Sequence, residues 1–81
     1  MLVDTQINKF ISIIKGRYPH LQIHHDYNED EDFHHIEHNY DRMYEDEEFP
    51  FFVGGLIRNL FFEKDIYNIS FGFVLQGKHD N

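Results

Sequence analysis

Cysteine is absent from the 81-residue chain, which excludes a disulfide framework and thiolate chemistry. No apolar run is long enough to cross a bilayer, since the longest, Phe49 to Phe62, contains Arg58 and Asn59. A secretory leader is not visible either, because Asp4 and Gln6 interrupt the first residues and no small-residue cleavage site follows. We therefore expect a soluble cytoplasmic protein without a membrane partner.

Basic residues are also scarce: seven Lys or Arg stand against fifteen Asp or Glu, for a formal net charge of −8. Binding to a phosphate backbone needs the opposite sign, so direct nucleic-acid binding is disfavoured. The acidic excess is local, because eleven of these acids and a single base, Arg42, fall between Asp26 and Glu48. This segment is either a solvated acidic face or a recognition surface for a basic partner.

One domain spanning residues 1–81 is expected, with nine Phe and five Tyr supplying the bulk of a small core. Apolar residues recur at helical spacing over 3–18 and 49–61, and period-two alternation predicts strands over 21–27 and 69–75. A further strand is predicted from Phe33 to Tyr40. Its face is ambiguous, because Phe33 points to one side and Ile36 to the other, so that either one aromatic stays outside or a bulge intervenes.

The order of elements is therefore α-β-β-α-β. It predicts an α+β fold in which two helices pack on one face of a small three-stranded, mainly antiparallel sheet. If the last strand lies beside the first, the crossover between them should be right-handed. The topology resembles a ferredoxin-like fold lacking its first strand, a likeness that carries no function. The predicted core consists of Ile7, Phe10, Ile11, Ile14, Leu56, Ile57, Leu60, Ile69, Phe71 and Phe73.

Metal ligands are abundant around the predicted hairpin, where five of the seven histidines fall. In one strand register four side chains share the outer face of the sheet and offer nitrogen and oxygen ligands for a transition metal: His24, Asp26, His35 and Glu37. Acids also follow Asp26 at the spacing of an EF-hand loop, but Glu31 stands where that loop needs glycine and the flanks are strands. A weak calcium site, a metal site and a pH-sensitive polar surface remain open readings.

Catalysis has little support in the sequence, and neither an enzyme nor a cofactor is expected. Ser12 and Ser70 are the only serines, and neither stands in a nucleophile-elbow context. Gly54 and Gly55 fall inside a helical pattern and lack the ending of a phosphate loop. We expect them instead to let the helix backbone approach a neighbour closely.

A second apolar patch is predicted on the side of the same helix that faces away from the core. Phe51, Gly55, Arg58 and Phe62 recur there at i, i+4, i+7 and i+11. Two large aromatics with an arginine between them are typical of an interface. The alternative is that they pack beneath the first helix or the tail.

These patterns favour a small acidic protein-interaction module, of the inhibitor or immunity type, that occupies a basic, nucleic-acid-binding surface of a protein partner. The expected contacts are the acidic residues Glu29, Asp30, Glu31, Asp32, Asp41, Glu45 and Asp46, and the apolar patch of Phe51, Phe62 and Arg58. One alternative is a metal-binding or metal-responsive domain using His24, Asp26, His35 and Glu37. Another is a structural homo-oligomer, in the form of a weak homodimer through Phe51 and Phe62.

Overall fold

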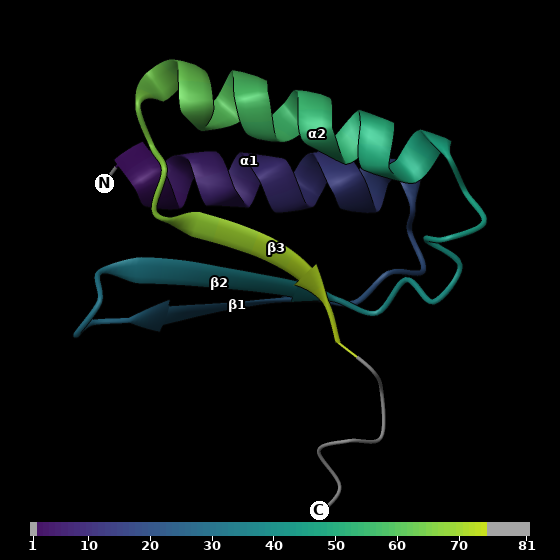
Figure 1. The fold of residues 1–81 in the computed structure, drawn as a ribbon, viewed down its shortest axis with the longest axis horizontal. Coiled ribbons are helices and arrows are strands. Elements are labelled where there is room, and N and C mark those ends of the chain that lie inside the picture. The colour runs from purple at the N-terminus through teal and green to yellow at the C-terminus, as the bar shows by residue number, and fades with distance from the viewer. Residues whose placement is uncertain (1, 75–81) are drawn as a thin grey trace, which may run out of the picture.

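A computed structural model describes residues 2–74 of the chain. Its elements are α1 (Leu2–Arg17), β1 (Ile23–Asn28), β2 (Phe33–His38), α2 (Glu48–Leu60), the 3-10 turn η1 (Phe62–Lys64) and β3 (Ile69–Phe73). The α-β-β-α-β order and the α+β class are confirmed, with both helices on one side of the sheet (Figure 1). The predicted strand end at Leu75 lies outside the described residues.

The sheet is mixed, with β2 in the centre between β1 and β3. The hairpin of β1 and β2 is antiparallel, as expected, whereas β2 and β3 run parallel. The last strand thus lies beside the second strand and not beside the first. The likeness to a ferredoxin-like fold is therefore only approximate.

Strand β2 keeps a continuous register with both neighbours, so no bulge is needed to place its side chains. Its even-numbered residues His34, Ile36 and His38 are buried, and the odd-numbered ones face the other side. Phe33 is the aromatic that stays outside, where its ring centroid lies 4.9 Å from that of His35. The ambiguity of this strand is thus resolved by leaving one aromatic on the outer face.

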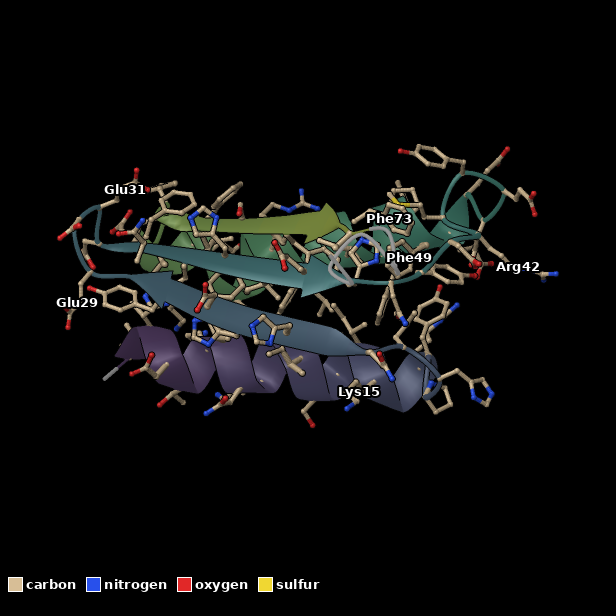
Figure 2. All side chains as sticks on the ribbon, turned by 90° about the horizontal axis from the view of Figure 1, so that it is seen from below. Lys15, Glu29, Glu31, Arg42, Phe49 and Phe73 are labelled. Atoms are coloured by element: carbon tan, nitrogen blue, oxygen red, sulfur yellow. The ribbon has the colours of Figure 1, made fainter. Side chains whose placement is uncertain are left out.

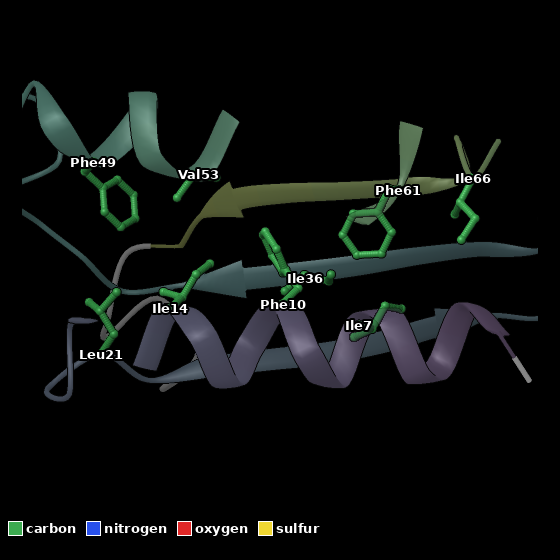
Figure 3. Packing of buried hydrophobic residues seen from close by; sticks show 9 residues of the cluster. All are labelled: Ile7, Phe10, Ile14, Leu21, Ile36, Phe49, Val53, Phe61 and Ile66. Atoms are coloured by element: carbon green, nitrogen blue, oxygen red, sulfur yellow. The ribbon is translucent and has the colours of Figure 1, made fainter. Parts of the chain in front are cut away.

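The core lies between the helices and the inner face of the sheet (Figure 3). Phe10 occupies its middle, with edge-to-face ring contacts to Phe61 at 5.4 Å and Phe71 at 5.1 Å. Such aromatic pairs add about 0.5–1.5 kcal/mol to the burial of their area. The buried apolar residues are Ile7, Phe10, Ile14, Leu21, Ile36, Phe49, Val53, Phe61 and Ile66.

Part of the predicted core is only half-buried, namely Ile11, Leu56, Ile57, Leu60, Ile69, Phe71 and Phe73. All of these except Phe73 pack against the buried cluster. Three of them, Leu56, Ile57 and Leu60, belong to α2, and three others, Ile69, Phe71 and Phe73, belong to the edge strand β3. Phe49 and Val53 are buried within that helix, and Phe61 is buried just after its end.

The expectation of a close approach at the two helix glycines is wrong. A Cβ atom added at Gly54 or at Gly55 would meet nothing within 4 Å. Neither glycine is required by packing against a neighbour within the described residues. Glycine nevertheless costs a helix interior about 1 kcal/mol relative to alanine.

Candidate interaction surfaces

The acidic segment is divided between the two ends of the sheet. The turn that precedes β2 holds the hairpin cluster, defined as Glu29, Asp30, Glu31 and Asp32. The connection that follows β2 holds the loop cluster, defined as Asp41, Glu45, Asp46 and Glu47. Figure 2 shows Glu29 and Glu31 at one end of the molecule and Arg42 of the loop at the other. A six-residue strand spans about 20 Å, so the two clusters do not form one face.

Internal hydrogen bonds fix the hairpin cluster. The hydroxyl of Tyr27 donates to Oδ1 of Asp32 at 2.7 Å, and the amide of Glu31 donates to Oδ1 of Asn28 at 3.2 Å. Asp32 has a φ of 52°, a left-handed conformation that aspartate tolerates better than most residues. The side chain of Asn68 donates to the carbonyl of Asp32 at 2.8 Å and ties the turn to the start of β3.

The loop cluster is held by Asp46. The hydroxyl of Tyr40 donates to Oδ2 of Asp46 at 2.7 Å, and the amide of Glu48 donates to Oδ1 at 3.0 Å. The bond from Tyr40 is the main reason why the pKa of Asp46 lies below its ordinary value, and the amides of Glu48 and Phe49 contribute. Asp46 thus anchors the start of α2, while Asp41 and Glu45 are exposed.

Cations neutralise little of this charge. Between residues of the described part of the chain there is one ion pair, Arg17 with Glu48 at 2.8 Å. Both of its side chains are at least half exposed, so the pair contributes little to stability. Asp32 and Asp46 are engaged in internal hydrogen bonds. The exposed carboxylates that remain available to an outside partner are those of Glu29, Asp30, Glu31, Asp41, Glu45 and Glu47.

The outer face of the sheet carries the four predicted metal ligands. In the observed register His24 stands opposite Glu37, and Asp26 stands opposite His35. Three of the four, His24, Asp26 and Glu37, line an open hollow of about 530 Å³ at the end of the sheet. Even so, within residues 2–74 no three His, Asp or Glu side chains are placed to hold a metal ion. The shared face is as predicted, but the convergence that a metal needs is missing there.

Ser70, His35 and Asp26 form a row across the same open face, one residue from each strand. The Oγ atom of Ser70 lies 3.5 Å from Nδ1 of His35. That separation is at the outer limit of a hydrogen bond, and Ser70 is exposed, so water competes for both groups. The contact between Ser70 and His35 is therefore weak.

The inner face of the hairpin carries three histidines that are not among the four predicted metal ligands. His34 and His38 are buried, and His25 stands opposite Ile36 on the same face. Nδ1 of His38 accepts a hydrogen bond from the amide of Tyr40 at 3.1 Å, and burial lowers the pKa of His38. His34 and His38 share the period-two spacing of the apolar residue Ile36, and this spacing could have indicated that they are buried.

The apolar patch of Phe51, Arg58 and Phe62 is less continuous than the helical wheel implies. Helix α2 ends at Leu60, so Phe62 belongs to η1 and stacks on Tyr67 with ring centroids 5.3 Å apart. Phe51 is 87% exposed and Phe62 is 44% exposed. The two aromatics are thus separate exposed groups near opposite ends of the helix.

An apolar groove lies between α2 and β3, and no sequence pattern predicts it. Its volume is about 240 Å³. Strand β3 forms an edge of the sheet, and in Figure 2 no element of the described residues lies on its far side. The groove therefore adjoins an unpaired strand edge.

Comparisons with protein-family models, with curated proteins and with solved structures find no match to this chain. No helix within residues 2–74 has the length and apolarity needed to cross a membrane.

Proposed function

We propose that this protein is a small acidic interaction module that occupies a basic surface of another protein. The observation that supports this proposal is the pair of acidic clusters, held at the two ends of β2 and unpaired with cations of the described residues. Crowded carboxylates repel one another, and a partner that supplies lysine or arginine relieves that repulsion.

Two fixed clusters about 20 Å apart suit a partner with two basic patches or one long basic strip. Complementary charge at the edge of an interface mainly speeds the encounter of the two proteins and excludes acidic competitors. An inhibitor or immunity-type role follows when the basic surface is itself a functional site of the partner. Direct binding to nucleic acid is disfavoured by the same charge.

The test uses three double variants of equal net charge. Asp30→Asn/Glu31→Gln neutralises the hairpin cluster, and Asp41→Asn/Glu45→Gln neutralises the loop cluster. The matched control, Asp4→Asn/Glu63→Gln, removes two exposed acids outside both clusters. Each variant is used as bait beside the unaltered chain, and captured proteins are identified by mass spectrometry.

We expect to capture a partner that has a basic surface. The unaltered protein and the control variant should retain this partner, and each of the two cluster variants should lose it. Its affinity should fall steeply as salt is raised, because charge between exposed groups is screened. Equal retention by all three variants would show that net charge alone, or no charge at all, governs binding. That result would refute the role of the two clusters.

A further inference from the structure

Strand β3 is an unprotected sheet edge. Its sequence, Ile69 to Phe73, contains no charged residue and no proline, the usual devices that prevent an edge from pairing. The other edge strand, β1, carries Asp26 and lies alongside α1 (Figure 2). An apolar edge of this kind favours pairing with another extended segment.

The backbone of β3 shows which of its groups are available. The amide of His34 donates to the carbonyl of Asn68 at 2.9 Å, and the amide of Val74 donates to the carbonyl of His38 at 2.9 Å. In a parallel ladder alternate residues bond to the same neighbour, so the even-numbered residues of β3 face β2. The N–H and C=O groups of residues 69, 71 and 73 therefore point to the open side.

The groove beside this edge is suited to apolar side chains. It is formed by Phe49, Val53, Gly54 and Ile57 of α2, by Phe71 of β3 and by Met43 of the loop. Gly54 lines the groove, and an added Cβ atom there would meet no neighbouring side chain or element within 4 Å. The helix is thus weakened at a position where packing does not require glycine.

Charge selects the kind of segment that fits. Asn68, just before β3, is bonded to Asp32 of the hairpin cluster, and the end of β3 pairs with His38, just before the loop cluster. The hairpin cluster therefore lies near the start of β3, and the loop cluster follows the strand that pairs with its end. A second copy of this chain is disfavoured, since two β3 edges paired antiparallel would set one copy's hairpin cluster against the other's loop cluster. A parallel pairing would set each acidic cluster of one copy against the same cluster of the other copy.

We infer that β3 and the groove take an extended peptide segment of the partner, added as a fourth strand. The segment has alternate apolar side chains directed at α2 and lysine or arginine at both ends. Main-chain bonds to residues 69, 71 and 73 would hold it, and the groove would select its side chains. This inference rests on the proposed function, because it names the chemistry of the basic partner.

The first experiment uses a labelled peptide of sequence Lys-Lys-Val-Thr-Val-Thr-Val-Lys-Lys and its counterpart with glutamate in place of every lysine. Fluorescence anisotropy measures binding to the full chain, and nuclear magnetic resonance locates it. We expect shifts of the amides of residues 69, 71 and 73, and binding about tenfold or more weaker for the glutamate peptide. Shifts confined to the acidic clusters would refute the edge but leave the acidic module standing. Equal binding of both peptides at the edge would refute the acidic module.

Methylation of the peptide backbone tests strand addition directly. One peptide carries N-methyl groups on its three valines, and another carries them on its two threonines. In an added strand only one of these sets of N–H groups faces β3. We expect one methylated peptide to lose binding and the other to keep it. Binding by both would overturn the inference.

Variants of the two adjacent glycines test the groove. Gly54→Gln places a neutral side chain in the groove, whereas Gly55→Gln places the same side chain outside it. Both substitutions favour the helix, so both proteins should fold. We expect Gly54→Gln to weaken binding of the lysine peptide by about tenfold or more and Gly55→Gln to leave its affinity unchanged. Equal affinity of the two variants would overturn the inference.

Discussion

The imidazole rings of His25 and His34 face each other beneath the sheet, with Nε2 of His25 lying 2.9 Å from Nδ1 of His34. A hydrogen bond between two ring nitrogens requires that only one of them carry the proton. Burial, and next the neighbouring ring, oppose a positive charge on His25. The inner face of the hairpin is therefore sensitive to acid.

The first prediction is a loss of stability below pH 6.5. Burial, and next the neighbouring His34, lower the pKa of His25 from its ordinary 6.5, while Asp4 and Asp26 oppose this. Burial also lowers the pKa of His38. The unfolded chain then binds more protons than the folded one below pH 6.5. The free energy of unfolding should fall as pH drops from 6.5 through the folded pKa values and then level off.

Urea denaturation at a series of pH values measures this slope. His25→Gln keeps an amide that can donate to His34 but does not titrate, so its slope should be shallower than that of the unaltered protein. His20→Gln is the matched control, because His20 is exposed. Equal slopes for all three proteins would contradict the prediction.

The second prediction concerns the bond between Tyr40 and Asp46. Because this bond lowers the pKa of Asp46, its stabilising effect should be complete above the ordinary value of 3.8 and be lost as pH falls through the folded pKa. Tyr40→Phe and Asp46→Asn should each destabilise the protein at pH 7. In combination their effects should be less than additive. Strict additivity in a double-mutant cycle would show that the two groups act independently.

The third prediction compares two neighbouring phenylalanines. Phe61 is fully buried, so Phe61→Ala should cost about 3–5 kcal/mol, enough to unfold much of a small domain. Phe62 is 44% exposed, so Phe62→Ala should cost far less. Chemical denaturation followed by circular dichroism measures both. Similar losses of stability in the two variants would mean that Phe61 and Phe62 do not differ in burial as described.

Sequence reasoning identified the helices, the strands and their order because each signal is local. The sequence could not show which face of β2 is buried, because Phe33 and Ile36 point to opposite faces. Only the pairing of β2 with both neighbours determines which face the helices cover. The partner of β3 was open for the same reason. Strand pairing depends on long-range contacts that a local pattern does not contain.

The candidate surfaces were predicted unevenly. The shared outer face of His24, Asp26, His35 and Glu37, predicted for one of the possible strand registers, matches the observed register. The division of the acidic segment was missed, since a continuous stretch in sequence was read as one surface. The groove was missed because Gly54 and Phe71 come together only once α2 has crossed over the sheet. A site made by a crossover leaves no local motif.

The last prediction concerns self-association through the exposed side of α2. Phe51 is almost fully exposed on α2, and Phe62 is partly exposed on η1, just after the helix ends at Leu60. Burying both in a symmetric dimer would remove apolar area from water. The net charge of −8 on each copy opposes this contact, so we expect a weak dimer that strengthens as salt is raised. Sedimentation of the unaltered protein and of Phe51→Ser at low and high salt measures the association. Tyr44→Ser serves as the control, since Tyr44 is 85% exposed but lies outside α2. A monomer at every concentration and salt, or equal association of the two variants, would rule out the dimer through this helix.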